Sequence, residues 1–123
     1  MNEPLVEIIV AGTPIPQGSK KVVGKYMIEA NAKTRPWRSA VSHEAYHHWQ
    51  NQELLDQPLL LHVDFYFARP KSHYRTGKNS TMLKENAPVY HCGKPDTDKL
   101  IRAIGDSLTG IVVRDDSRFV ILQ

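Results

Sequence analysis

Four aspartates near the C-terminus are the residues of this sequence best suited to act together in catalysis. Asp96 and Asp98 are separated by one residue, and Asp115 and Asp116 follow later in the chain. If the backbone at 96–98 is extended, the first two carboxylates project from the same side. A helix followed by a return of the chain would bring Asp116 back beside them. Crowded carboxylates repel one another, and oxygen ligands suit a hard cation such as Mg²⁺, which can polarise a phosphodiester.

The same spacing also has a purely structural explanation. Asp98 is a suitable N-cap for a following helix, and Asp115-Asp116 is a suitable turn. Short polar residues collect at helix caps and turns in any protein. Spacing alone therefore leaves both interpretations open.

The helix expected after these acids carries charged residues on one face. Asp98, Arg102 and Asp106 follow one another at intervals of four, and Lys99 lies near that face. A cation beside a carboxylate–metal group would stabilise charge that develops on a phosphate. The alternative is an ordinary ion pair between Arg102 and Asp106, worth about 0.3–0.5 kcal/mol on an exposed helix.

A basic segment precedes the aspartates. Residues 69–78 hold four Lys or Arg residues and no acid, and they surround Tyr74. This mixture can bind phosphates and stack on an unpaired base, although a solvated surface loop has the same composition. The residues expected to contact nucleic acid are Lys71, His73, Arg75 and Lys78, together with Lys20, Lys21 and Lys99.

A third motif matches the H-E-x-x-H pattern of zinc proteases. His43, Glu44 and His47 fall on an expected helix, where the two histidines would share a face. A zinc site needs a further ligand, and the extended form of the pattern would require Gly at 50 and His at 53, where this chain has Gln50 and Glu53. A polar helix face explains these histidines better than a protease does.

The elements that position these residues follow from hydrophobic periodicity. Alternation of apolar and polar residues predicts strands, and spacings of three and four predict helices. The expected strands cover 5–11, one or two short stretches within 20–29, 59–67 and 118–123, and the expected helices cover 36–54 and 99–109. Residues 69–95 show no periodicity and form a long loop, which is usually functional or disordered. This order predicts an α+β fold, a single small domain over residues 1–123 with one mixed β-sheet and two main helices packed on it.

The composition sets limits on the class of protein. The chain has 123 residues, a formal net charge of +3 and 41% hydrophobic residues, enough for a modest core. No apolar run approaches the roughly 20 residues that span a bilayer, and no signal peptide is recognisable, so we expect no membrane association. Cys92 is the only cysteine and excludes an intrachain disulfide, and we expect it to be a half-buried thiol. These features predict a cytoplasmic protein.

Three segments taken together resemble the RusA family of Holliday-junction resolvases, small endonucleases of phages and prophages. The segments are Lys94-Pro95-Asp96-Thr97-Asp98-Lys99-Leu100 with Arg102, Asp106-Ser107-Leu108-Thr109-Gly110, and Asp115-Asp116-Ser117-Arg118-Phe119-Val120. Arg69-Pro70-Lys71-Ser72-His73 and the loop Gly12-Thr13-Pro14-Ile15-Pro16 are also similar to the family. The resemblance covers most of the chain, and residues 94–120 carry most of its specificity.

The resemblance implies a homodimer that binds branched DNA and resolves a four-way junction with two symmetric nicks, using Mg²⁺ with Mn²⁺ as the expected substitute. By position, Asp96, Asp98 and Asp116 match the essential carboxylates, Asp115 is the neighbouring acid and Asp106 matches the helix aspartate. The acids are thereby expected to hold the metal.

The chain departs from the family pattern at three places. Arg102 stands where the family has lysine, and Lys99 stands where it has asparagine. Because arginine stays charged, we expect Arg102 to stabilise the phosphate or the transition state. The chain also ends inside a predicted strand, where relatives continue, so we expect a shortened C-terminus. The alternative function is a non-catalytic nucleic-acid-binding module of the same fold.

Overall fold

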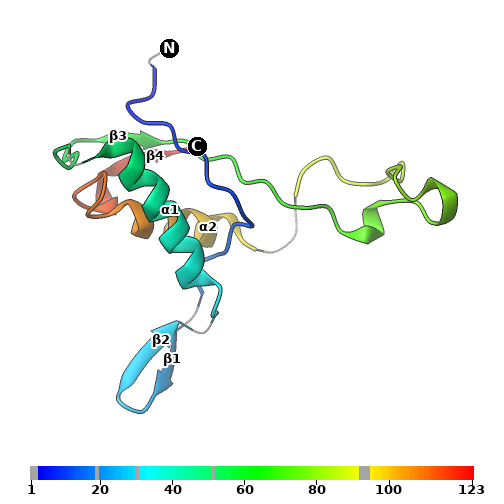
Figure 1. Ribbon diagram of the computed structural model, residues 1–123, viewed down its shortest axis with the longest axis horizontal. Helices are drawn as coiled ribbons and strands as arrows, with labels where there is room; N and C mark the ends of the chain where they lie inside the picture. The colour runs from blue at the N-terminus through cyan, green and yellow to red at the C-terminus, as the bar shows by residue number, and fades with distance from the viewer. Residues whose placement is uncertain (1–2, 19, 30, 51, 92–94) are drawn as a thin grey trace.

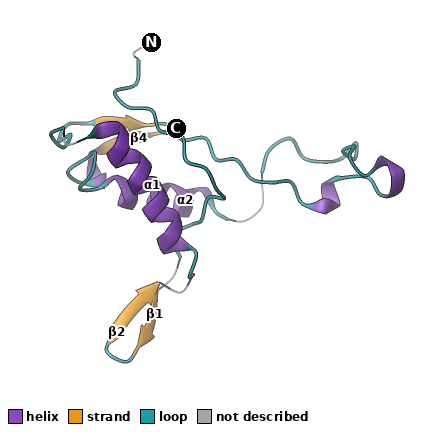
Figure 2. Ribbon diagram, viewed as in Figure 1, coloured by secondary structure: helices purple, strands orange, loops and turns teal. Residues whose placement is uncertain are grey.

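The chain is described by a computed structural model that covers residues 3–18, 20–29, 31–50, 52–91 and 95–123. At residues 20, 21 and 26–29 the description is confined to the backbone. The predictions for Cys92 and Lys94, and for the side chains of Lys20 and Lys21, lie outside the described part. Two helices lie against a small sheet, and two segments project from this body (Figures 1 and 2).

The first helix, α1, covers Thr34–Trp49 and confirms the predicted amphipathic pattern. Every fourth residue of its inner face is buried, namely Trp37, Val41, Ala45 and Trp49. The helix ends earlier than the predicted Leu54 because Gln50 takes a left-handed conformation with a φ of 43°. There its backbone N–H donates to the carbonyl of Tyr46 at 2.8 Å.

The second helix, α2, covers Thr97–Leu108 and begins two residues before the predicted start. Its N-cap is Asp96, not Asp98 as predicted, and Asp98 lies in the first helical turn. Leu100, Ile104 and Leu108 are buried, which confirms the predicted apolar stripe. The chain then turns at Gly110, whose φ of 80° favours glycine.

The strands form two separate pairs and not the single mixed sheet that was predicted. An antiparallel hairpin joins β1 (Lys20–Val23) to β2 (Tyr26–Glu29), and a parallel pair joins β3 (Leu59–Leu61) to β4 (Phe119–Leu122). The predicted strand at 59–67 is therefore shorter than expected. Its alternation of half-buried and exposed residues nevertheless continues to Phe67.

The segment at 5–11 has the predicted extended alternation but does not form the predicted strand. Val6, Ile8 and Val10 are half-buried and pack on the core, while their neighbours are exposed. The segment is therefore extended, as the alternation requires. It has no strand pairing within the described residues, so it covers the core without joining a sheet.

The hydrophobic core lies where the two helices meet the β3–β4 pair. Ala45 of α1 and Ala103 of α2 are both fully buried, and Val113 is 1% exposed. Leu59, Leu61 and Phe119 contribute from the inner face of the strands. On the outer face, Leu60 and Val120 are more than half exposed, so the helices cover one face of this pair.

Two segments extend beyond the core (Figure 1). One is the β1–β2 hairpin, and the other is a long arm formed by residues 66–91. The predicted long loop at 69–95 is confirmed over 69–91, where two single-turn 3₁₀ helices, Lys71–His73 and Gly77–Asn79, are the only helical turns. Among the described residues, no helix is long and apolar enough to cross a membrane.

Candidate functional site

Asp116 lies against the side of α2. It begins a 3₁₀ turn, Asp116–Arg118, that follows the chain reversal after α2. A Cβ placed on Gly105 would meet the Cβ of Asp116 at 3.3 Å and its Oδ2 at 3.7 Å. A side chain at position 105 would crowd Asp116, so this glycine permits the close approach between helix and turn.

Three acids gather around this approach, namely Asp106, Asp115 and Asp116. The pKa of Asp116 is raised by its hydrogen bond with Asp115, by desolvation, and by the negative charges of Asp115 and Asp106. The backbone N–H and hydroxyl of Ser117, and then the hydrogen bond with Asp116, lower the pKa of Asp115. The pair therefore favours one shared proton, or a cation in its place.

Asp96 and Asp98 lie at the beginning of α2, away from this group. The prediction of an extended backbone through 96–98 is wrong, because Asp98 is already helical. Asp98 and Gly105 are seven residues apart and therefore lie on one face, separated by about 10 Å along the axis. Within the described ranges, no three His, Cys, Asp or Glu residues are arranged to hold one metal ion. The roles of Asp96, Asp98 and Asp116 remain predictions.

Arg102 lies between these two acidic ends on the same face of α2. It is exposed and has no hydrogen bond or ion pair with another described residue. The alternative ion pair between Arg102 and Asp106 is absent from that part of the chain. Asp106 instead lies 3.6 Å from Nη1 of Arg38 on α1, and that guanidinium also donates to Gln17 at 3.2 Å.

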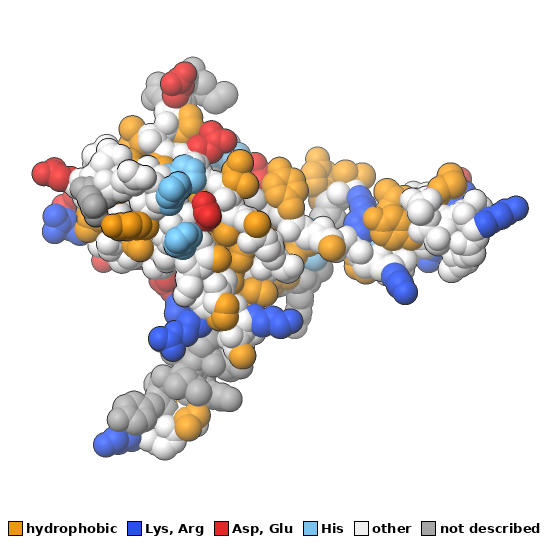
Figure 3. Space-filling model, viewed as in Figure 1, with side chains coloured by type: hydrophobic (Ala, Val, Ile, Leu, Met, Phe, Trp, Pro, Cys, Tyr) orange, Lys and Arg blue, Asp and Glu red, His pale blue; other side chains and the backbone are white. Residues whose placement is uncertain are grey.

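The basic residues of the arm lie far from the core on an exposed scaffold (Figure 3). The arm folds back on itself, since the N–H of Arg75 donates to Met82 and the N–H of Lys84 donates to His73. Lys71 and Lys78 are exposed, whereas His73 and Arg75 are half-buried. Between residues 69 and 91 there are five Lys or Arg residues and a single acid, Glu85. Lys99, on α2, is also exposed.

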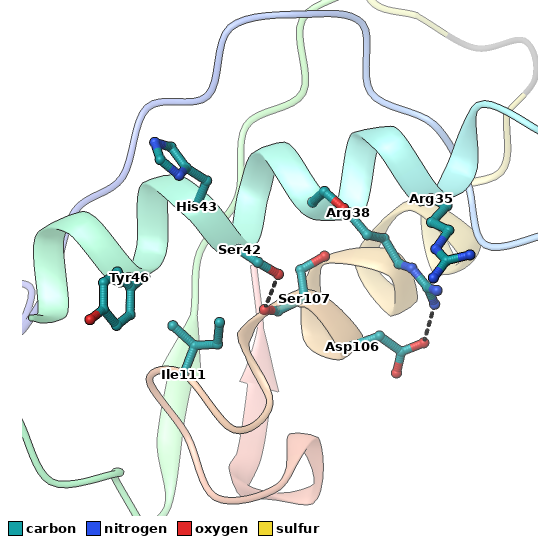
Figure 4. A pocket seen from close by; sticks show the side chains of 9 residues that line it. Arg35, Arg38, Ser42, His43, Tyr46, Asp106, Ser107 and Ile111 are labelled. Atoms are coloured by element: carbon teal, nitrogen blue, oxygen red, sulfur yellow. Dashed lines mark hydrogen bonds and ion pairs between the residues drawn. The ribbon is translucent and has the colours of Figure 1, made fainter. Parts of the chain in front are cut away.

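The H-E-x-x-H motif lies on α1, as predicted. His43 and His47 are exposed, and they line two adjoining hollows of about 580 and 360 Å³ beside the helix. Figure 4 shows the larger hollow, with Asp106, Ser107 and Ile111 on the side opposite α1. No third metal ligand accompanies the two histidines among the residues described.

Two residues of this region were not predicted from the sequence. The sequence gives Arg38 no distinguishing pattern, and its ion pair with Asp106 arises only because the packing of α1 brings it toward α2. Gly105 gave no signal beyond its unusual place inside a helix, where glycine costs about 1 kcal/mol relative to alanine. Such a glycine is a sign of close packing.

Comparison with known proteins concerns the chain as a whole. No solved structure matches the chain. The chain is 27% identical to the uncharacterized protein YqaN of Bacillus subtilis strain 168 over 124 residues, covering 96% of this chain and 84% of that protein. The family described as endodeoxyribonuclease RusA matches residues 11–123. Because this match spans nearly the whole chain, including both helices and the acidic turn, the protein belongs to the RusA endodeoxyribonuclease family.

Proposed function

We propose that the protein is a Mg²⁺-dependent endonuclease that resolves four-way DNA junctions with paired symmetric nicks. Membership of the RusA family supports a nuclease acting in recombination. The observation that carries the proposal is the face of α2, on which Arg102 lies between Asp98 and the acids packed at Gly105. A phosphodiester bound at Arg102 would have carboxylates on both sides.

The acidic side chains on this face are of the chemical type that binds a divalent cation. Asp96, Asp98, Asp115 and Asp116 offer only oxygen ligands, which Mg²⁺ prefers and Mn²⁺ accepts. The contact between Asp115 and Asp116 concentrates negative charge that a cation would neutralise. When bound, such an ion supplies Lewis-acid polarisation of the phosphodiester and activation of water.

The side chains of the chain perform the remaining tasks. Asp115 and Asp116 would supply carboxylate ligands to a divalent cation at the Gly105 end of the α2 face. Asp96 and Asp98 would supply carboxylate ligands at the other end of this face, about 10 Å along the helix. Arg102 stabilises negative charge on the phosphate, because a fixed guanidinium is worth most where charge develops. Asp106 keeps Arg38 in place through their ion pair.

The arm and the hairpin grip the DNA backbone in this proposal. Lys71 and Lys78 on the arm are exposed cations at the far end from α2, and Lys20 and Lys21 belong to the hairpin strand β1. Phosphate contacts of this kind supply affinity without sequence preference. The bacterial cytoplasm, where such DNA is found, is the proposed location.

A homodimer completes the proposal, since its two-fold axis would match that of the junction. Several large apolar side chains outside the core are about 80% exposed, namely Ile9, Tyr66, Val89 and Tyr90. Contiguous exposed apolar surface marks interfaces, and Val89 and Tyr90, which are adjacent in the sequence, are the residues proposed to be buried in the dimer. Sedimentation of the wild-type chain and of Val89→Asp tests this point, with a dimer expected only for the wild type.

The decisive experiment is nicking of a synthetic four-way junction in the presence of Mg²⁺. Asp98→Asn and Asp116→Asn are expected to abolish nicking, whereas Asp64→Asn, an exposed acid on another segment, is expected to leave it unchanged. Equal nicking by all four proteins would refute the proposed site. A wild-type protein that cuts linear duplex as fast as the junction would refute the substrate.

A second candidate is a non-catalytic module that binds branched DNA. It is favoured by one observation, that no three acids are assembled around a common point in the described residues. Tight binding of the junction by the wild type, with no nicking under any divalent ion, would select this function over the nuclease.

A further inference from the structure

An open hollow lies between α1 and α2, and a second, smaller hollow continues from it along the exposed face of α1. The two hollows share His43 and Tyr46, and the second is lined by residues of α1 alone. We call the two hollows together the α1 groove. From Arg35 to Gln50 it extends about 22 Å along the helix, enough for about six nucleotides at the roughly 3.4 Å spacing of one DNA strand.

The lining of the α1 groove suits a polyanion. Arg35 is exposed at one end and has no hydrogen bond or ion pair with another described residue. The charge of Arg38 is already matched by Asp106 at 3.6 Å, so Arg35 leaves the groove with a net positive charge. His43 and Ser39 supply N–H and O–H groups that can donate to phosphate oxygens.

The floor of the groove is fixed by contacts between the two helices. The hydroxyl of Ser42 donates to the carbonyl of Ser107 at 2.8 Å (Figure 4). Ser107 is buried, and its own hydroxyl donates to the carbonyl of Ala103 at 2.6 Å. The groove is therefore part of the packed fold and exists before any ligand binds.

The groove leads to the acidic face of α2. Asp106 lines the groove, and its neighbour Gly105 is the residue against which Asp116 packs. A strand that leaves the groove at Asp106 therefore reaches the acids within one residue of helix.

We propose that the α1 groove binds one strand of the DNA substrate and delivers it to the acidic face of α2. The inference rests on the proposed nuclease function and adds a substrate path that neither the aspartates nor the arm provides. Arg35 binds a phosphate at the end of the path beside Arg38 and Asp106. His43 contacts the strand midway, and the ring of Tyr46, which is 53% exposed, offers a surface on which a base can stack.

The test compares variants of α1 that carry the same substitution on different faces. His43→Glu places a negative charge in the groove, and His48→Glu places it on the same helix outside the groove. Both histidines are exposed, so both variants are expected to fold. Fluorescence anisotropy with a labelled four-way junction, without divalent ions, is expected to show a Kd raised about tenfold for His43→Glu only.

A second pair of variants removes one positive charge, either inside the α1 groove or outside it. Arg35→Gln is expected to reduce the slope of log Kd against log salt by about one, because one phosphate contact is lost. Arg114→Gln is the matched control, since Arg114 is bound to Asp56 at 3.3 Å and lies outside the groove. If His43→Glu fails to fold, judged by circular dichroism, this pair decides the question.

The outcomes separate the groove from the nuclease function. If the wild type nicks the junction while groove and control variants bind it equally, the groove inference is overturned and the proposed function stands. If the wild type neither binds nor nicks the junction, both are overturned. Selective loss of binding in His43→Glu and Arg35→Gln supports the groove.

Discussion

Asp116 packs directly against Gly105, and this contact joins the acidic turn to α2. The two residues are eleven positions apart, and the intervening chain reverses direction through the turn at Gly110. A Cβ at position 105 would lie 3.3 Å from the Cβ of Asp116, closer than ordinary van der Waals contact. The position of the Asp116 carboxylate is therefore set by the absence of a side chain on the helix.

Gly105→Ala tests this relationship. We expect little change in thermal stability, because alanine gains about 1 kcal/mol of helix propensity while the exposed turn yields by a few tenths of an ångström. Junction nicking is expected to fall by about 10²-fold, the scale of loss that small misplacements of reacting groups produce. Nicking at the wild-type rate would show that the exact position of Asp116 is unimportant. Circular dichroism melting and single-turnover nicking measure the two effects.

Asp116→Asn is expected to separate stability from activity. The pKa of Asp116 is raised in the folded state, so the native protein binds more protons than the unfolded chain just above the ordinary Asp pKa of about 3.9. Its contribution to stability is therefore present at low pH and is lost as the pH rises through the folded pKa. At pH 7 the Asn variant should melt no lower than the wild type, while nicking is lost.

The control for this prediction is Asp115→Ala, whose effect on stability is expected to depend on pH in the opposite direction. The pKa of Asp115 is lowered by the donors of Ser117, so its contribution to stability is present above the ordinary Asp pKa and fades as the pH falls. Asp115 Oδ1 accepts from the Ser117 N–H at 2.9 Å, and alanine removes this acceptor. We expect a lower Tm at pH 7, with the difference from the wild-type Tm shrinking as the pH falls below the ordinary Asp pKa, measured by scanning calorimetry. Identical pH profiles for the two variants would contradict the assigned directions.

Variants of Arg102 test whether this residue acts through its positive charge. If it acts only as a fixed cation, Arg102→Lys should keep most of the nicking rate, whereas Arg102→Gln should lose about 10²-fold. Because Arg102 is exposed and unpaired with other described residues, neither variant should change the Tm. Single-turnover rates on the junction give the comparison, and equal rates for Lys and Gln would remove Arg102 from the site.

The arm gives a prediction about affinity alone. Lys71→Gln combined with Lys78→Gln removes two exposed cations and should reduce the salt slope of junction binding by about two. The nicking rate at saturating protein should stay unchanged, because the arm is distant from α2 in the fold. A loss of the saturated rate without a change in the salt slope would assign these lysines a role other than phosphate binding. Titrations by anisotropy at several salt concentrations give the slope.

Local patterns in the sequence predicted the parts of the fold that depend on short-range periodicity. The buried residues of α1, from Trp37 to Trp49, follow directly from their spacing of four. The start of α2 was misplaced because Asp96, Thr97 and Asp98 are all good N-cap residues, and sequence offers no means to choose among them.

Long-range relationships could not be predicted in the same way. Val6, Ile8 and Val10 alternate as a strand does, but whether a neighbour pairs with them depends on the whole fold. The contact of Gly105 with Asp116 and the ion pair of Arg38 with Asp106 likewise arise from packing of α1, α2 and the acidic turn. The family pattern predicted which acids act together, but their separation into two groups along α2 became visible only in the fold.

The arm has a consequence for how proteins of this kind can diversify. None of residues 69–91, all of which are described, is buried, so the arm can change length without disturbing the core. Each doubling of a flexible loop costs only about 0.6 kcal/mol in closure entropy. Insertions and deletions there would alter how far the protein reaches along DNA while leaving the helices and their chemistry intact. Relatives that act on DNA of different geometry are thus expected to differ in the length of this one segment.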